Sequence, residues 1–474
     1  MPANQLRSND QSVWFIASLV YVSVCSYIFI AALPEYSDSN RFYACTLFVF
    51  CTFPLIRHIV RDDATVPILE IPLASYAVYY CLPLLYQSEH AVYATTIVPS
   101  PKHIDRTLIG VILGVVGMIS GYVAAKSFNL LSIIPKITVP EFRSGPLARV
   151  ALSIIAASFL FQLLIGSAPA GTERIVAVLL SQDVAIALLG ILYYTNCLSK
   201  GYTALAICLL IALTFKGLVS GSTQTALQPL FVWALTGWIT RKQFPYKMAL
   251  LGIVAALITQ PVKKQYRQQV WFGKSSQSTA IERFELYVKI GLDHWVRNKD
   301  MRGSAISDQI EKSAAERFSL LLHSQRYFQL TPEKIPYKNG ESVGYLFYGW
   351  IPRVLWPGKP GAQIANRKYP VEYGIQHPAS VKKSSFGIGH TTEAYVNFGL
   401  AGIFPLFMLL GALVRLPIDI LKTRSTNNPV ARSIQCFATI NLMFVGSTIG
   451  NAYGSLVTGL IAQAILLRFL ARNL

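Results

Sequence analysis

The run GIGHTTEAYVNFGLAG, from Gly387 to Gly402, closes the one long polar stretch of this chain and leads back into apolar sequence. That stretch extends from Pro261 to Asn397, and most of the sequence on either side of it is apolar. Of the 474 residues, 53% are hydrophobic and only 14% are charged. This composition is typical of a membrane protein. The alternation of apolar runs with one polar stretch therefore decides the fold class.

The apolar runs predict transmembrane helices, because about 20 apolar residues in a helix cross the hydrocarbon core of a bilayer. The predicted spans are 13–33, 42–60, 67–86, 107–128, 147–166, 173–194, 203–220, 223–240, 245–261, 398–418, 431–447 and 450–470. The sequence has little period-2 alternation, which disfavours an outer-membrane barrel. We predict an all-α polytopic membrane protein with about twelve transmembrane helices. One large extracytoplasmic loop carries amphipathic helices.

The predicted organisation has three parts: a transmembrane bundle over 1–260, a large loop over 261–397 and further transmembrane helices over 398–474. Lys and Arg cluster after the even-numbered spans, as in Arg57, Arg61 and Lys126. Because cytoplasmic loops carry such residues, we predict cytoplasmic termini and an exported loop. The first apolar run is long and lacks a following small-residue cleavage site, so it is predicted to be a retained span.

The net charge of +19 needs no nucleic-acid partner, because the cytoplasmic clusters are accounted for by topology. The stretch from Pro261 to Asn397 nevertheless holds 20 Lys and Arg against 11 Asp and Glu. This excess fits contact with anionic lipid headgroups or an anionic ligand. Within the stretch, Ala280–Val296 and Asp308–Tyr327 have the apolar periodicity of amphipathic helices, which often lie in the membrane interface.

Nucleotide-binding signatures are lacking, because neither a Walker-type loop nor a dinucleotide-binding glycine pattern occurs. The seven cysteines lie in or beside apolar runs and show no metal-ligand or disulfide spacing. We therefore expect no cofactor and no metal. A reaction on the outer face of a membrane would need a substrate that is already activated.

The cationic candidates begin with Arg353, which lies within IPRVLWPGKP (Ile351 to Pro360). Prolines and a Trp frame this Arg, and a guanidinium group matches phosphate oxygens with a planar fork of donors. Phosphate binding and simple headgroup contact both remain open. Lys263, Lys264 and Arg267, just beyond the ninth span, support the same prediction less strongly.

Ionisable residues within predicted spans are costly in hydrocarbon and usually face a bundle interior or a cavity. In the predicted topology, Asp183 and Lys216 both lie toward the outer half of neighbouring spans. They are predicted either to pair with each other or to leave Lys216 lining an outward-facing cavity. Glu70 is interpreted as structural.

The polar residues of the closing run are the candidates for proton transfer. His390, Glu393 and Asn397 share one helix face if the tenth span begins early. His390 or Glu393 could then act as a general base toward a sugar hydroxyl. The alternative is helix capping by Thr391 or Thr392, with Glu393 in the first turn.

These two motifs together resemble those of the Wzy-type oligosaccharide repeat-unit polymerases, which assemble O-antigen and exopolysaccharide. The resemblance rests on IPRVLWPGKP, followed some thirty residues later by EAYVNFGLAG with Glu393, Gly399 and Gly402. His390 is also similar to the His of the related O-antigen ligases. One departure is SGSTQT (Ser220 to Thr225), where Gln224 stands at a position that is Arg in relatives. Either Lys216 supplies the charge there or the correspondence fails.

The resemblance implies inverting glycosyl transfer on the outer, periplasmic face of a bacterial inner membrane. Donor and acceptor would be polyprenyl-diphosphate-linked oligosaccharides, and a flippase and a chain-length regulator would be partners. Arg353, Lys359 and either Lys216 or Arg267 would bind the diphosphate, with Lys264 nearby. His390 or Glu393 would accept the proton of the attacking hydroxyl. The alternatives are an O-antigen ligase that modifies a lipid A core, a lipid-linked sugar transporter or flippase, and, least favoured, a structural scaffold.

Overall fold

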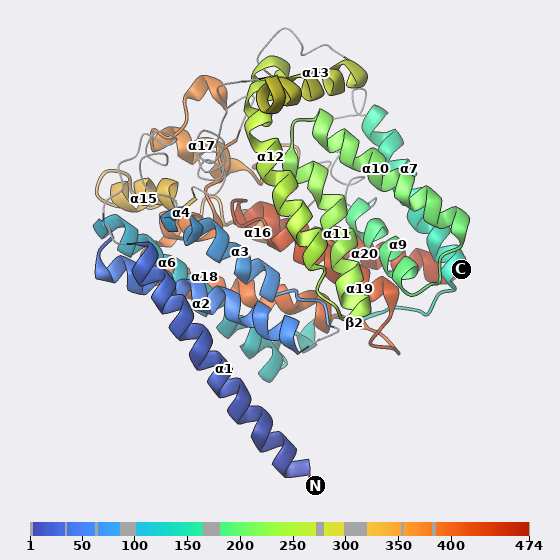
Figure 1. Ribbon diagram of the computed structural model, residues 1–474, viewed down its shortest axis with the longest axis horizontal. Coiled ribbons are helices and arrows are strands. Elements are labelled where there is room, and N and C mark those ends of the chain that lie inside the picture. The colour runs from blue at the N-terminus through green and yellow to red at the C-terminus, as the bar shows by residue number, and fades with distance from the viewer. Residues whose placement is uncertain are drawn as a thin grey trace.

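The structure is a computed structural model. It describes residues 3–33, 36–61, 65–85, 101–164, 181–271, 279–297, 320–351, 355–381 and 385–473. These residues are mostly helical, as Figure 1 shows.

The first half contains α1 (Ala3–Ala32), α2 (Asp38–Val60), α3 (Glu70–Tyr80), α4 (Leu82–Leu85), α6 (Pro101–Ser127), η1 (Leu130–Ile133), β1 (Ile137–Thr138), α7 (Ser144–Leu164), α9 (Gln182–Tyr194), α10 (Lys200–Val219) and α11 (Thr223–Arg241). The second half contains α12 (Tyr246–Trp271), α13 (Ala280–Leu292), η4 (Asp293–Arg297), α15 (Leu320–Leu330), α16 (Tyr345–Tyr348), α17 (Ile364–Glu372), η5 (Pro378–Ser380), α18 (His390–Asp419), β2 (Leu421–Lys422), α19 (Pro429–Leu442) and α20 (Ile449–Asn473).

Five helices within the described residues are long and apolar enough to cross a membrane. Their bounds are Asp38–Val60, Lys102–Ser127, Lys200–Val219, His390–Asp419 and Ile449–Arg472. Four shorter apolar helices are Ala17–Ala32, Ser144–Phe159, Gln182–Tyr194 and Tyr246–Ala256. The prediction of an α-helical chain with membrane-type helices is confirmed at this level.

The predicted count of twelve spans is not reached in the described part of the chain. The run 67–86 is divided into α3, with 11 residues, and the four-residue α4. The run 431–447 gives α19, which ends at Leu442 after 14 residues. Such helices are shorter than the roughly 20 residues needed to cross alone. Hydropathy measures the composition of a run, and it does not report where the helix within the run ends.

One group of helices is built on α6 and α18, which pack along each other, with α2 and α3 alongside. Small residues allow this close approach. A Cβ atom at Gly121 would lie 1.9 Å from the carbonyl oxygen of Met408, and one at Gly411 would lie 2.0 Å from that of Met118. Beyond these helices, β1 and β2 form a short parallel pair with Ile137 opposite Leu421.

A second group contains α7, α9, α10 and α11, and α19 joins it by packing on α9 (Figure 1). The predicted helix break near Gly221 is confirmed, because α10 ends at Val219 and α11 begins at Thr223. Gly221 has φ +70°, a conformation that favours glycine. Ser222 caps α11 by accepting the backbone N–H of Thr225. This turn lies at the edge of the site described below.

Two helices extend into the predicted loop 261–397, one from each end. Helix α12 continues through Pro261 to Trp271, because Val262, Tyr266 and Val270 recur at helical spacing and pack in a small separate core. At the other end, α18 begins at His390, as the conditional prediction of an early start required.

The two predicted amphipathic helices of the loop have different outcomes. The first corresponds to α13, over Ala280–Leu292, and its existence is confirmed. For the second, α15 covers Leu320–Leu330, whereas residues 298–319 lie outside the described part of the chain.

Candidate functional site

A cleft of about 770 Å³ lies where α11 and α12 face the segments that precede α17, α18 and α20. Seven amide side chains line it: Gln224, Gln228, Gln268, Gln363, Asn366, Asn441 and Asn451. Two cations, Lys263 and Arg267, line the α12 side. The described residues of the lining include no Asp and no Glu. The cleft is therefore both positively charged and rich in uncharged hydrogen-bonding groups.

The cationic side is formed where α12 meets the turn between α10 and α11. Nε of Arg267 donates a hydrogen bond of 2.8 Å to the carbonyl oxygen of Gly221. That bond fixes the guanidinium group at the turn that leads into α11, and Arg267 and Gln224 both line the cleft. Lys263 lies one turn earlier on α12 and is buried. A basic side chain is thus present at the SGSTQT turn, but α12 supplies it.

The opposite side is an amide-rich wall that backbone and side-chain contacts hold in place. Oδ1 of Asn366 accepts the backbone N–H of Ile388 at 2.9 Å, and its Nδ2 donates to Oε1 of Gln363 at 3.2 Å. Nδ2 of Asn451 donates to the Ser447 hydroxyl at 2.9 Å. Amides both donate and accept hydrogen bonds, which suits the hydroxyl groups of a sugar.

His323 is the one His among the described residues that line the cleft. It is placed by α15, and its ring meets the Phe386 ring edge-on with centroids 4.3 Å apart. Burial lowers the pKa of His323 to about 3. The imidazole is therefore neutral at physiological pH and, with this pKa, only a weak base. A bound anion nearby would raise its pKa by favouring the charged form.

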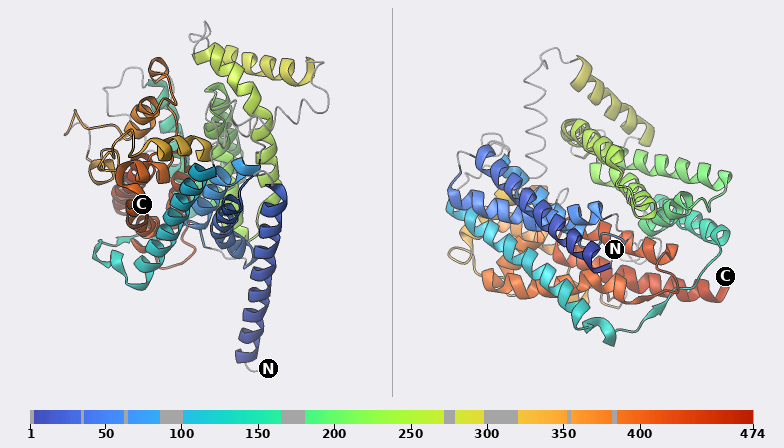
Figure 2. Two further views of the ribbon diagram at one scale, coloured as in Figure 1. Left: turned by 90° about the vertical axis from the view of Figure 1, so that its left-hand side faces the viewer. Right: turned by 60° about the horizontal axis from the view of Figure 1, so that its bottom comes forward.

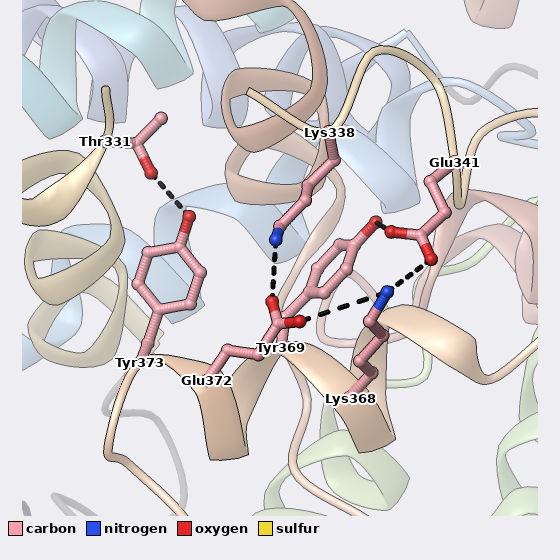
Figure 3. A network of polar contacts seen from close by, with 7 residues as sticks. All are labelled: Thr331, Lys338, Glu341, Lys368, Tyr369, Glu372 and Tyr373. Carbon is pink, nitrogen blue, oxygen red and sulfur yellow. Dashed lines mark hydrogen bonds and ion pairs between the residues drawn. The ribbon is translucent and has the colours of Figure 1, made fainter. Parts of the chain in front are cut away.

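A polar network holds α17, the helix that carries Asn366, against the segment 331–341 (Figure 3). Nζ of Lys368 lies 2.5 Å from Oε1 of Glu341, and Nζ of Lys338 lies 2.8 Å from Oε2 of Glu372. The Tyr373 and Thr331 hydroxyls lie 2.5 Å apart. The hydrogen bond that Glu341 accepts from Lys368 raises the pKa of Lys368. The network fixes the position of the amide-rich wall.

The predicted proton acceptors lie together, but they are buried behind the cleft and are not among its lining residues. Oε2 of Glu393 accepts the backbone N–H of Ile449 at 2.6 Å, and Ile449 is the first residue of α20. Nδ1 of His390 lies 3.1 Å from the Tyr76 hydroxyl. Asn397 donates from Nδ2 to the Ser342 hydroxyl at 3.0 Å. The three residues share one side of α18, as predicted, and that side is turned toward the protein interior.

Lys359 does not reach the cleft, because its ammonium group holds the preceding loop together. Nζ donates to the carbonyl oxygens of Gly349 at 2.9 Å and Ile351 at 2.6 Å. Nζ also lies 5.3 Å from the centroid of the Tyr345 ring. Lys359 is therefore engaged with the backbone of Gly349 and Ile351.

The remaining ionisable residues singled out from the sequence have three different outcomes. Lys216 is half-buried in α10 with Nζ 5.6 Å from the Phe159 ring centroid, and it is not a lining residue of the cleft. Asp183 accepts a hydrogen bond from Gln228 at 2.8 Å, and these described residues show no ion pair between Asp183 and Lys216. Arg353 and the side chain of Lys264 lie outside what the structure describes.

Sequence reasoning did not identify His323 or the amide lining. His323 lies in the middle of a run with amphipathic helical periodicity, where a single His carries no specific signal. The seven amides come from segments between residues 224 and 451, and they meet only in the fold. Among the described residues, no group of three or more His, Cys, Asp or Glu could hold a metal ion.

Residues 72–419 match the family model of a domain of unknown function, DUF8712. The chain belongs to this family. The matched region runs from α3 to the end of α18, so it includes Lys263, Arg267 and His323, while α19 and α20 lie beyond it. Neither a curated protein nor a solved structure matches the chain. The family description names no activity.

Proposed function

We propose that the protein is a membrane glycosyltransferase that joins polyprenyl-diphosphate-linked oligosaccharides into a longer glycan. The observation that carries this proposal is the chemistry of the cleft: two cations, seven amides and no carboxylate among its described lining residues. Cations suit a diphosphate, and amides suit sugar hydroxyls. The membrane-type helices beside it suit a lipid-linked substrate.

The cationic side of the cleft would bind and stabilise the leaving group. In the transfer, the bond between the anomeric carbon and the diphosphate oxygen breaks as the acceptor hydroxyl oxygen bonds to that carbon. Negative charge develops on the departing diphosphate, and Lys263 and Arg267 would stabilise it. Arg267 is held by Gly221, so its guanidinium group is oriented before substrate binds.

Proton transfer from the attacking hydroxyl needs an acceptor within the cleft. His323 is neutral, lines the cleft and would take this proton, which the developing diphosphate charge would then help to stabilise. The earlier hypothesis for His390 or Glu393 stays untested. Neither residue is among the lining residues of the cleft, and Glu393 connects α18 to the start of α20, which carries Asn451, so a positioning role is favoured.

The proposed setting is the outer face of a bacterial inner membrane, with both termini in the cytoplasm, as the distribution of Lys and Arg predicts. Some of the shorter apolar helices would add crossings to the five long ones. A flippase would supply the substrate, and a chain-length regulator would be a partner. The donor is activated by its diphosphate, which agrees with the lack of a nucleotide-binding signature in the sequence.

The test uses purified full-length protein in lipid vesicles with a polyprenyl-diphosphate oligosaccharide. We expect longer lipid-linked glycans and free polyprenyl diphosphate. Transfer only to an added lipid A core would favour the ligase. Movement of the substrate across the vesicle membrane without a new glycosidic bond would favour the flippase. If vesicles with and without the protein gave the same products and the same substrate distribution, the proposal would be wrong.

A further inference from the structure

Helix α13 lies across the end of α12, next to α10, and it has one face packed on the protein (Figures 1 and 2). On that face, Leu286, Tyr287 and Ile290 pack against Val262, Tyr266 and Val270 of α12. The rings of Phe284 and Phe215, the latter from α10, lie 4.7 Å apart. The Tyr266 hydroxyl donates to the carbonyl oxygen of Val219. These contacts fix α13 firmly to the two helices.

The other face of α13 is apolar and exposed. Ile281, Val288 and Leu292 are 69%, 40% and 49% exposed. Their spacing of seven and four residues places them on one side of a helix. A shallow hollow of about 290 Å³ lies on this helix, lined by Phe284, Glu285, Val288, Lys289 and Leu292. A helix with charges alternating along an exposed apolar face is typical of membrane interfaces.

The apolar surfaces next to α13 indicate what covers this face. Exposed apolar side chains continue from it along α10 and α12: Leu205, Ile207 and Ile211, then Leu250, Leu251, Ile253, Val254 and Ile258. Helix α10 is itself one of the five membrane-type helices. The exposed apolar run of α12 stops at Ile258, whose carbonyl oxygen accepts a hydrogen bond from Nε1 of Trp295 at 3.1 Å. Trp and Tyr are enriched at the membrane–water interface.

The cleft cations lie on the same part of α12 as the residues that hold α13. Val262 and Tyr266 face α13, whereas their chain neighbours Lys263 and Arg267 line the cleft. At 1.5 Å per residue, Lys263 lies about 7 Å along the helix beyond Ile258. The depth of α13 in a bilayer therefore determines the depth of Lys263 and Arg267.

We propose that the exposed face of α13 docks into the headgroup region of the bilayer and sets Lys263 and Arg267 at the depth of lipid phosphates. The docking itself does not depend on the proposed function. The identity of the anion that the cations receive, a lipid-linked diphosphate, does rest on it. Interfacial helices bury their apolar face by about 5–10 Å, which matches the shallow placement inferred for α13.

The test measures depth in the full-length chain, reconstituted in phosphatidylethanolamine–phosphatidylglycerol vesicles. Single cysteines replace Val288 or, as a deep control, Leu251, in a background with the exposed Cys197 and Cys208 changed to Ser. An environment-sensitive fluorophore is attached, and lipids with spin labels in the headgroup or in the acyl chain quench it. At position 288 we expect about twofold stronger quenching by the headgroup label, and at position 251 the reverse order.

Two results would overturn the docking proposal. One is quenching at position 288 by aqueous iodide and by neither spin-labelled lipid, which would place the face in water. The other is energy transfer between donor- and acceptor-labelled copies at position 288 that survives dilution in lipid, which would show that a second copy covers the face.

A paired variant separates docking from catalysis. Val288→Glu with Leu292→Glu should move a probe at position 281 from lipid to iodide quenching, whereas Lys289→Ala should leave it in lipid. If the probe stayed in lipid in the double variant, α13 would not be held by this face. Lipid quenching at position 288 without any glycan transfer by the native chain would leave the docking intact and refute only the proposed function.

Discussion

The cleft and the buried start of α18 are both rich in polar side chains, but they are built in opposite ways. The cleft collects charged and amide groups from α11, α12, α15, α17, α19 and α20 and leaves them open to a ligand. The start of α18 places His390, Glu393 and Asn397 on consecutive turns and buries all three. A cluster that is compact in sequence thus lies in the interior, and a dispersed set forms the open site.

The contrast teaches that access to the cleft separates these two sets better than burial or residue type does, since Lys263 and His323 line the cleft although they are buried. Oε2 of Glu393 already accepts a backbone N–H from α20, which is a structural use of a carboxylate. Nε of Arg267 donates to the carbonyl oxygen of Gly221, and Arg267 is a lining residue of the cleft. The proposed function accordingly places binding and transfer in the cleft, and Glu393 supports the start of α20.

The largest expected effect is that of His323→Ala on transfer. Removing a general base lowers the rate by about 10²- to 10⁴-fold. Steady-state transfer in vesicles measures this, with His377→Ala, at an exposed His, as the matched control. A His323→Ala protein that transfers as fast as the native one would remove His323 from the mechanism.

The dependence of kcat/KM and kcat on pH also tests the proposed role of His323. Because burial lowers the pKa of His323 to about 3, the free protein should keep kcat/KM unchanged between about pH 8 and 5. The profile of kcat should fall at a higher pH than that of kcat/KM, because bound diphosphate raises the pKa of the base. A fall in kcat/KM near the ordinary His pKa of about 6.5 would contradict the buried, neutral imidazole.

The next effect concerns the cations. Lys263→Ala and Arg267→Ala should each lower kcat by about 10²-fold or more, since each removes a donor to the developing charge. Lys247→Ala removes a Lys from the other end of the same helix and should leave kcat unchanged. Circular dichroism and thermal unfolding check that each variant folds. Equal rates for the Lys263→Ala and Lys247→Ala proteins would break the assignment of the cationic side.

Variants of Glu393 distinguish the buried start of α18 from the cleft, because we expect them to change the free energy of unfolding more than the rate of transfer. Glu393→Ala leaves the N–H of Ile449 without an acceptor in a buried site, which costs about 1–3 kcal/mol. Glu393→Gln keeps an acceptor oxygen, so it should unfold at nearly the native Tm and keep transfer within about tenfold of native. If Glu393→Gln folded normally but lost transfer as His323→Ala does, the proton acceptor would be Glu393.

The sequence could predict much of the fold class because hydropathy is local. Helices such as α10, α11 and α13 follow from runs that need no knowledge of their neighbours. The lengths of α3 and α19 could not be read, because the ends of these helices depend on packing. The continuation of α12 past Pro261 depends on α13, which covers Val262 and Tyr266.

The site was less predictable, because the positions of its side chains also depend on packing between distant segments. Arg267 was a candidate from sequence, and its place beside Gly221 gives it a role that spacing alone could not show. Lys359 looked like a phosphate ligand, but two carbonyl groups of its own loop hold its ammonium group. The burial of His390 and Glu393 is a tertiary property, and the hypothesis of a base could not anticipate it.

The smallest expected effect is on the network that supports the amide-rich wall. Lys368→Met breaks the contact with Glu341, but both side chains are partly exposed, so the cost is about 0–1 kcal/mol. Because the pKa of Lys368 is raised in the folded state, its contribution is present below the ordinary Lys pKa and is lost as pH rises through the raised value. Thermal unfolding at pH 8 should distinguish Lys368→Met from the control Arg367→Met, and the difference should disappear in strong alkali. A difference that grew with pH would contradict the ion pair.

Binding of polyprenyl diphosphate to the full-length protein in vesicles tests the central claim most directly. The measurement compares the dissociation constants of the native chain, the Lys263→Ala/Arg267→Ala variant and the Glu393→Gln variant. We predict that the double variant binds at least about tenfold more weakly, since charge-assisted hydrogen bonds to phosphate are lost, and that Glu393→Gln binds as the native chain does. Native affinity in the double variant, or a loss confined to Glu393→Gln, would contradict the assignment of the cleft as the site of the diphosphate.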